Sequence, residues 1–119
     1  HICGVTYPIF EDLIGCGFTT ISFDLDQQSD PTLHVDQLER FVQVAKGRAV
    51  AIGNVDATMF EKATRPQIEG EVGRCIDTAA RQSGFILSTS CEIPPRSNPE
   101  IVKWFMDAAH DLGRYERIL

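Results

Sequence analysis

Three residues of this sequence, His1, Cys3 and Cys91, are of types that bind transition metals. His1 and Cys3 are two positions apart, and residues with that spacing on a strand point to the same side. Cys91 follows a short apolar run, residues 84–87, which reads as a strand. Two sulfurs and one nitrogen suit zinc, and three protein ligands leave one position open for a substrate. The same spacing also fits cysteines that simply pack in a core.

Two acidic residues accompany these candidate ligands. Asp24 follows a predicted strand, residues 18–23, and its carboxylate could be a fourth metal ligand or a catalytic base. The alternative for Asp24 is an ordinary loop-capping or salt-bridging carboxylate. Glu92 directly follows Cys91 and could assist catalysis from beside the metal ligands.

A second polar group follows the apolar run at residues 49–52. Asn54 and Asp56 come after the predicted end of that strand, at the edge where the candidate ligands lie. We expect both side chains to line the substrate pocket. The alternative is that they shape a turn, which asparagine, aspartate and glycine commonly do.

The remaining cysteines indicate a different role. Cys16 lies between two glycines at a helix end, and Cys75 lies on the apolar face of a predicted helix. Both are predicted to be small core residues rather than ligands. The four cysteines could form two disulfides, but we expect a cytoplasmic protein, in which disulfides are rare.

The bulk composition excludes several classes of function. The chain has 119 residues, a formal net charge of −6 and no basic run, which argues against a nucleic-acid partner. No apolar stretch approaches the roughly 20 residues that a membrane-spanning helix needs. No signal peptide is recognisable, and the chain begins at His1 without a methionine, as a processed chain or a fragment would.

Strands and helices alternate along the chain. Pro8 is expected to start a short helix, and strands are predicted at residues 18–23, 49–52 and 84–87. The Asp36–Glu39 and Thr64–Gln67 pairs resemble capping boxes at the starts of two longer helices. The second of these helices is predicted over residues 65–82. Asn98 and Pro99 are typical of the start of the last helix.

This alternation predicts an α/β fold with parallel strands. Because a complete (β/α)8 TIM barrel takes roughly 250 residues, we expect residues 1–119 to form one partial domain, the C-terminal half of a barrel. An open doubly wound sheet is the alternative, although the sequence has no glycine-rich phosphate motif. Half a barrel exposes edge strands, so we expect self-association or a missing N-terminal half that completes the core.

Several motifs resemble those of the uroporphyrinogen decarboxylase superfamily. They are residues 1–4 (HICG), 51–56 (AIGNVD), 85–95 (FILSTSCEIPP) and 113–115 (GRY). The resemblance covers essentially the whole chain and implies the C-terminal part of that barrel.

Within the superfamily, the H-x-C motif and the late cysteine resemble the corrinoid-dependent methyltransferases of the methylcobalamin:coenzyme M type. This resemblance implies that His1, Cys3 and Cys91 bind zinc, with Asp24 able to complete the site. It also implies a methylated corrinoid on a partner protein as the methyl donor, and a small thiol as the acceptor. Residues 5–7 (VTY) depart from the small polar residues usual after H-x-C-G, which leaves the identity of the thiol open.

Two other functions are compatible with the sequence. Metal-free decarboxylation of a tetrapyrrole follows from superfamily membership alone, and it would need arginines to hold substrate carboxylates. Arg48, Arg65 and Arg96 are not obviously placed for this purpose. A non-catalytic fragment or interaction module is the third possibility.

Overall fold

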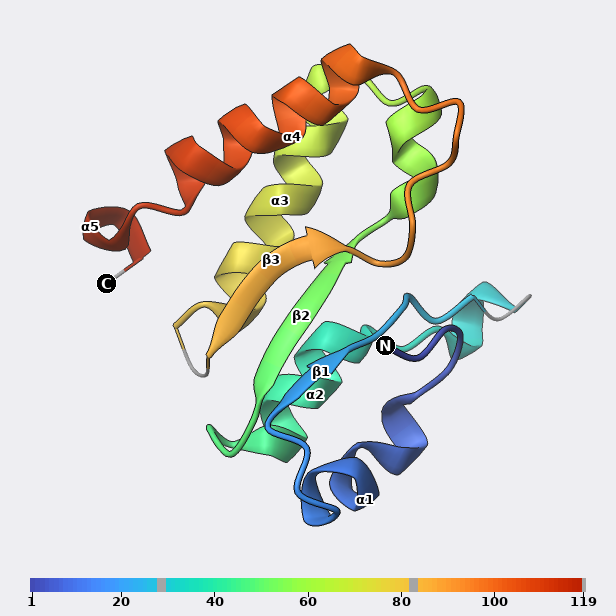
Figure 1. Cartoon of the computed structure of the whole chain (residues 1–119), viewed down its shortest axis with the longest axis vertical. Helices are drawn as coiled ribbons and strands as arrows, with labels where there is room; N and C mark the ends of the chain where they lie inside the picture. Colours follow the sequence, from blue (N-terminus) through green and yellow to red (C-terminus); the bar gives the residue numbers. More distant parts are fainter. Residues whose placement is uncertain (28–29, 82–83, 119) are drawn as a thin grey trace.

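The chain forms a small α/β fold around a parallel three-stranded sheet. Strands β1 (Thr20–Ser22), β2 (Val50–Val55) and β3 (Phe85–Thr89) lie side by side in their order along the chain. Their carboxyl ends therefore share one edge of the sheet (Figure 1). This arrangement is consistent with part of a TIM-barrel-like domain. In this computed structural model, the described residues are 1–27, 30–81 and 84–118.

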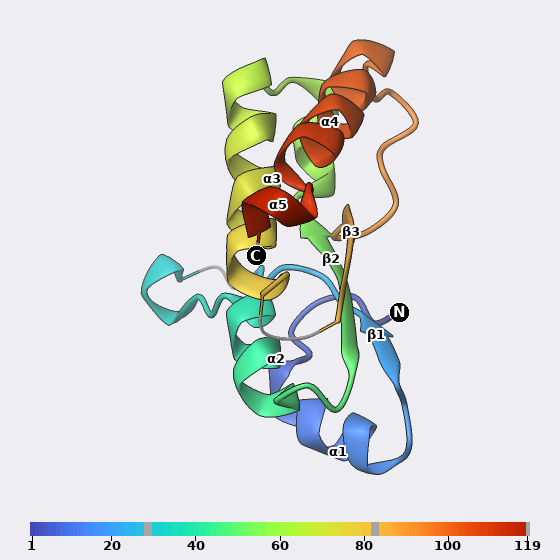
Figure 2. The same ribbon diagram turned by 90° about the vertical axis from the view of Figure 1, so that its left-hand side faces the viewer.

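Helices α2 (Gln37–Ala45) and α3 (Arg65–Ala79) connect successive strands and pack on one face of the sheet (Figures 1 and 2). The longer helix α4 (Pro99–Leu112) packs against α3. The opposite face of the sheet carries none of the described helices (Figure 2). Shorter helical segments complete the fold: η1 (Tyr7–Ile9), α1 (Phe10–Gly15), η2 (Pro31–Leu33), η3 (Ala57–Glu61) and α5 (Tyr115–Ile118).

The predicted helix starts are confirmed by their side-chain caps. The Asp36 carboxylate accepts hydrogen bonds from the first turn of α2, and the Asn98 side chain does the same for α4. Thr64 and Gln67 form the predicted capping box of α3. These caps satisfy backbone N–H groups that have no partner within the helix. The predicted end of α3 at Gln82 lies outside the described residues.

Strand β1 is shorter than predicted. The sequence favours a strand over residues 18–23, but only Thr20–Ser22 joins the three-stranded sheet. Phe18 lies outside the sheet with 56% of its surface exposed. Phe23 instead forms an isolated parallel bridge with Ile2, so the amino-terminal residues run beside the end of β1.

Strand β2 is longer than predicted, and the prediction that Asn54 follows the strand is wrong. The apolar run stops at Ile52, but β2 remains paired with β3 as far as Val55. Asn54 therefore lies within the strand. Its polar side chain finds hydrogen-bond partners on α3, so the strand can continue into the core without a purely apolar sequence.

Three phenylalanine rings hold the amino-terminal part of the fold together. Phe10 from α1, Phe23 after β1 and Phe41 from α2 are fully buried. Their ring centroids lie 4.9 to 5.2 Å apart in all three pairs. Aromatic pairs at this distance add stability beyond the area that they bury. This cluster fixes the end of β1 against two helices.

None of the described helices combines the length and the apolar character needed to cross a membrane.

The phenylalanine cluster gives a direct stability prediction. Replacing Phe23 with alanine is expected to lower the free energy of unfolding by about 3–5 kcal/mol, because a fully buried aromatic side chain leaves a cavity. The control Phe18→Ala removes an exposed ring and is expected to stay within about 0.5 kcal/mol of the wild type. Urea denaturation followed by circular dichroism measures both. Equal losses in the two variants would contradict the proposed importance of the cluster.

Candidate functional site

The amino-terminal residues are held beside β1 by backbone hydrogen bonds. The Ile2 N–H donates to the Ser22 carbonyl at 3.0 Å, and the Asp24 N–H donates to the Ile2 carbonyl at 3.3 Å. Alternate residues of an extended chain point to opposite sides. His1 and Cys3 therefore share the side opposite to Ile2.

Three candidate metal ligands converge at this point. The Cys3 sulfur lies 3.4 Å from Nε2 of His1 and 3.8 Å from the Cys91 sulfur. One ligand atom from each of the three residues lies within 4.8 Å of the others. His1 and Cys3 are exposed and Cys91 is half-buried, so the group is open to solvent. The structure thus brings together residues that are 88 positions apart in the sequence.

The imidazole of His1 has a defined orientation. A hydrogen bond of 2.8 Å joins its Nδ1 to the hydroxyl of Ser22, which leaves Nε2 facing the sulfurs. Metal-binding histidines usually have the second ring nitrogen held in this way, which fixes the ring and its tautomer. The sequence patterns do not single out Ser22, because its role depends on the pairing of the amino-terminal residues with β1.

The position of Cys91 is set by the ends of β2 and β3. The Ser90 N–H donates to the Val55 carbonyl at 2.7 Å, and the Ser90 hydroxyl accepts from the Ala57 N–H at 3.2 Å. The Thr89 hydroxyl donates to the Cys91 carbonyl at 2.7 Å. These bonds tie the segment after β3 to the end of β2, and so they aim Cys91 toward Cys3.

The Cys91 thiol influences the ionisation of Cys3. The pKa of Cys3 is raised, first by its hydrogen bond to Cys91 and then by charge repulsion from the same residue. Desolvation and the negative charges of Asp24 and Glu92 add to the shift. Without a cation, the group therefore resists becoming a pair of thiolates. A metal ion would reverse this balance, because its charge favours thiolate ligands.

Asp24 lies next to the group but outside the set of mutually close ligand atoms. It is buried, and its carboxylate accepts the N–H of Leu25 at 2.7 Å and that of Gly4 at 3.5 Å. Gly4 has a φ of +75°, a left-handed conformation that glycine adopts most readily. Asp24 therefore stabilises the turn after Cys3. Glu92 is exposed beside Cys91.

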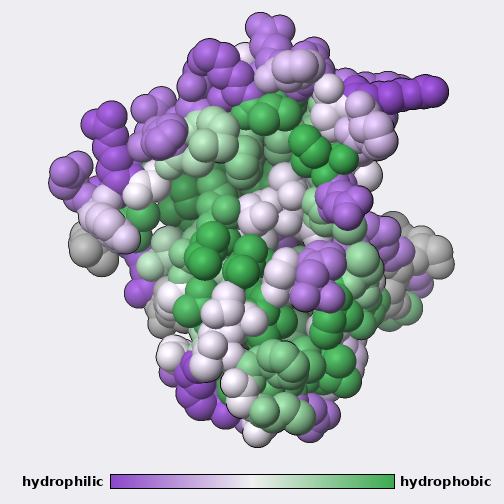
Figure 3. All heavy atoms as spheres, viewed as in Figure 1, coloured by the Kyte–Doolittle hydropathy of each residue, from purple (hydrophilic) through white to green (hydrophobic). Residues whose placement is uncertain are grey.

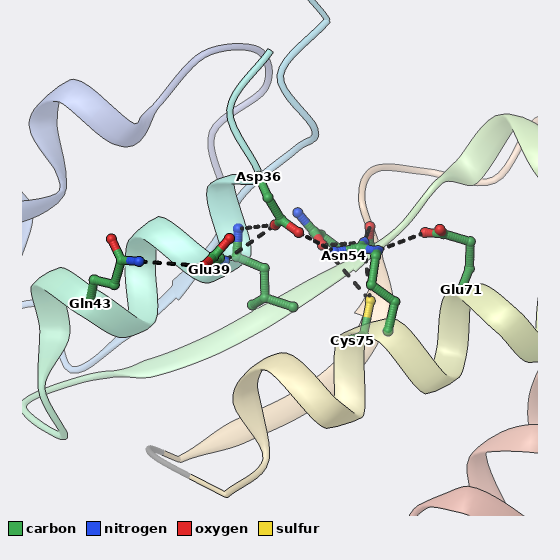
Figure 4. A network of polar contacts seen from close by, with 8 residues as sticks. Asp36, Glu39, Gln43, Asn54, Glu71 and Cys75 are labelled. Atoms are coloured by element: carbon green, nitrogen blue, oxygen red, sulfur yellow. Dashed lines mark hydrogen bonds and ion pairs between the residues drawn. The ribbon is translucent and has the colours of Figure 1, made fainter.

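Asn54 is directed away from the group of candidate ligands. Its side-chain oxygen accepts a hydrogen bond of 3.1 Å from Arg74 and lies 3.9 Å from the Cys75 sulfur. Arg74 also pairs with Asp36 at 3.0 Å and Glu71 at 3.2 Å, so β2, α3 and the start of α2 meet here (Figure 4). Within the described ranges, Nδ2 of Asn54 is buried without a hydrogen-bond partner. Burial raises the pKa of Cys75, and the adjacent guanidinium offsets part of that rise.

Asp56 also lies apart from the candidate ligands. Its carboxylate accepts from the N–H and the hydroxyl of Thr58 and caps η3, which is the turn role considered from the sequence. Asp56 borders a cavity of about 860 Å³ that also includes Asp36 and Arg74. None of the three candidate ligands lines this cavity.

The sheet face near the ligand group carries apolar side chains and none of the described helices. Ser22, Ile52 and Ile86 are neighbours in register across the three strands, and 52% of the Ile86 surface is exposed. Figure 3 shows hydrophobic side chains gathered over the middle of this face. The hydrogen bond between His1 and Ser22 places the imidazole on the same face.

Comparison with known proteins identifies the kind of domain. The family model described as Uroporphyrinogen decarboxylase (URO-D) matches residues 1–112. The matched range contains all three clustered residues and every strand of the sheet. No curated protein is similar enough to the chain to count as a match.

The Arg74 network gives a second stability prediction. The variant Arg74→Met keeps the apolar stem but leaves the Asn54 oxygen and the Asp36 carboxylate without their guanidinium partner. We expect the free energy of unfolding to fall by about 1–3 kcal/mol, the usual cost of a buried polar group without a partner. The control is Arg65→Met, which removes an exposed ion pair with Glu69 on the same helix. Chemical denaturation should show a clearly smaller change for the control, and equal changes would contradict the prediction.

Proposed function

The chain belongs to the uroporphyrinogen decarboxylase family, and from this premise we propose that it serves in zinc-dependent methyl transfer. The proposed reaction moves a methyl group from a methylated corrinoid to the sulfur of a small thiol. Members of this superfamily are generally enzymes. Zinc-dependent methyl transfer is proposed because His1, Cys3 and Cys91 form a group whose ligand atoms lie within 4.8 Å of one another.

The sheet topology supports the view that the chain is the C-terminal half of a (β/α)8 barrel. Successive strands are direct neighbours, and both connecting helices, α2 and α3, pack on the same face. In a barrel every connecting helix lies on the outer face of the sheet, as these two do. The apolar row on the bare face has the character of a barrel interior.

The chemistry of the donor atoms supports zinc rather than magnesium or calcium. Thiolate sulfur and imidazole nitrogen are soft or borderline donors, whereas magnesium and calcium require oxygen ligands. Three protein ligands match the catalytic pattern, in which a fourth position remains for substrate. Asp24, beside Cys3, is the proposed fourth ligand when no substrate is bound.

Zinc held there would supply one property, a lowered pKa of a coordinated substrate thiol. The residues of the chain have the remaining tasks. Ser22 holds the His1 ring, and Asp24 supports the turn that follows Cys3. Exposed Glu92 is the proposed acceptor of the thiol proton. Overall, the sulfur–carbon bond forms, the cobalt–carbon bond breaks, and the electron pair of that bond stays with the corrinoid.

The proposal implies two partners that must reach the same place. A small thiol approaches the open position among the ligands, and a corrinoid protein presents its methyl group from the solvent side. The exposure of His1 and Cys3 is compatible with this approach. Asp56 borders a separate cavity, and we propose it as a contact for a more distant part of a substrate.

Zinc content tests the metal part of the proposal. The 119-residue chain, purified and dialysed against metal-free buffer, is expected to retain about one zinc ion, as a site with three protein ligands would. The variant Cys91→Ser should lose most of the metal, because it removes one of two sulfur ligands. Elemental analysis by mass spectrometry measures the content. The control is Cys16→Ser. Cys16 is exposed, so the prediction that it is a core residue is wrong, and it lies outside the ligand group. This variant should keep the wild-type zinc content.

A paired activity assay tests the reaction itself. Supplied with methylcobalamin and coenzyme M, the chain completed by the rest of its proposed barrel should form methyl-coenzyme M. The variant Cys3→Ser should lower the rate at least about 100-fold, because metal activation contributes several kcal/mol. In a parallel reaction, uroporphyrinogen is supplied and coproporphyrinogen is sought. Decarboxylation that persists in Cys3→Ser, without methyl transfer by the wild type, would overturn the proposal in favour of tetrapyrrole chemistry.

A further inference from the structure

The side chain of Gln37, the first residue of α2, is buried between the segment that follows Cys3 and the backbone of Asp24. Only 1% of its surface is exposed. Its side-chain oxygen accepts the N–H groups of Thr6 at 2.6 Å and Tyr7 at 2.8 Å. Its side-chain nitrogen donates to the carbonyl of Gly4 at 3.0 Å and to that of Asp24 at 2.7 Å. The amide therefore uses both of its acceptor positions and both of its donor hydrogens.

We infer that Gln37 is a positioning residue for the proposed metal site. Three of its four bonds go to the segment that follows Cys3, and the fourth goes to the end of the segment that pairs with Ile2. Gly4, Thr6 and Tyr7 all lie within four residues of Cys3. Through these bonds, Gln37 sets the distance between the segment that carries Cys3 and the backbone of Asp24.

The arrangement requires an amide of this length. A carboxylate in the same place could accept both N–H groups but could not donate to the two carbonyls. A methionine would fill the space but would leave all four backbone groups without this partner. Unpaired buried polar groups are costly, so the segments would move apart to reach water. Because the Asp24 carboxylate also accepts the Gly4 N–H, movement of one segment displaces both.

A purely structural role predicts a different pattern. An amide that only stabilised α2 would bond to the helix or to the sheet beneath it. All four bonds of Gln37 instead reach segments that adjoin proposed ligands. The test by zinc affinity rests on the proposed function. A second measurement, made without metal, tests the role of Gln37 independently of the proposed function.

The test compares three variants in the 119-residue chain. Gln37→Met removes all four bonds, Gln37→Glu keeps only the two acceptor bonds, and Gln43→Met is the control. Gln43 lies exposed on the same helix, and its amide lies 3.5 Å from Glu39. Circular dichroism establishes which variants are folded. Zinc affinity is measured by competition with a chelator, and the ligand geometry by the absorption spectrum of the cobalt-substituted protein.

We expect Gln37→Met to bind zinc about 10- to 100-fold more weakly than the wild type, the usual effect of removing support for metal ligands. The cobalt spectrum should change as well, which a loss of helix stability alone would not cause in a folded protein. The zinc affinity of Gln37→Glu should lie between those of the wild type and Gln37→Met. If Gln37→Met does not fold, Gln37→Glu alone tests the positioning role. Wild-type affinity and an unchanged spectrum in a folded Gln37 variant would overturn the inference.

A metal-free measurement separates this inference from the proposed function. In a Cys16→Ser background, the chain is equilibrated with glutathione, and the disulfide between Cys3 and Cys91 is quantified by mass spectrometry. In this exchange, the reduced pair of Cys3 and Cys91 reacts with one oxidised glutathione and gives the protein disulfide and two reduced glutathiones. Disulfide geometry is demanding, so displacement of Cys3 in Gln37→Met should lower the equilibrium constant several-fold, whereas Gln43→Met should not.

The proposed zinc function and the positioning role of Gln37 are contradicted by different results. If the wild type binds no zinc, the proposed function fails, and the disulfide equilibrium alone decides the role of Gln37. A several-fold decrease confined to the Gln37 variants supports the positioning role. Equal disulfide constants in Gln37→Met, Gln43→Met and the wild type overturn it.

Discussion

The pairing of Ile2 with the end of β1 is the constraint on which the candidate site depends. Two backbone hydrogen bonds to Ser22 and Asp24 fix both the position and the register of the amino-terminal residues. Register matters because a slip by one residue would turn every side chain to the opposite face. His1 and Cys3 would then face the helix layer instead of Cys91. The geometry of the candidate ligands is thus a consequence of main-chain pairing as much as of the residue types.

Packing in the core stabilises this pairing. Phe23, the bridge partner of Ile2, belongs to the cluster of three phenylalanines that joins α1, β1 and α2. The same helix α2 begins with Gln37, whose amide holds the segment after Cys3. One helix therefore contacts the residues that follow β1 twice, through the ring of Phe41 on Phe23 and through the amide of Gln37 on the Asp24 carbonyl. Core packing and site geometry are coupled because they share these elements.

The sequence predicted the features that depend on local chemistry. Helix caps at Asp36 and Asn98 were recognisable because a side chain and its backbone partners lie within three residues of each other. The convergence of Cys3 and Cys91 followed from the shared edge of parallel strands and from family resemblance. The end of β2 was mispredicted because Asn54 is stabilised by Arg74, 20 positions away. Gln37 escaped notice for the same reason, since its partners lie outside its own helix.

The proposed methyl transfer rests on the donor atoms of the candidate site and not on the fold. One fold serves many reactions, so family membership alone does not choose between methyl transfer and decarboxylation. The two sulfurs lie 3.8 Å apart, and Cys91 raises the pKa of Cys3, which disfavours the Cys3 thiolate when no cation is bound. A bound cation would attract both thiolates and would so offset the repulsion between them. In the proposed barrel, the remaining strands would cover the apolar face around Ile86 and lower the local dielectric, which would strengthen the pull of the metal on a substrate thiol.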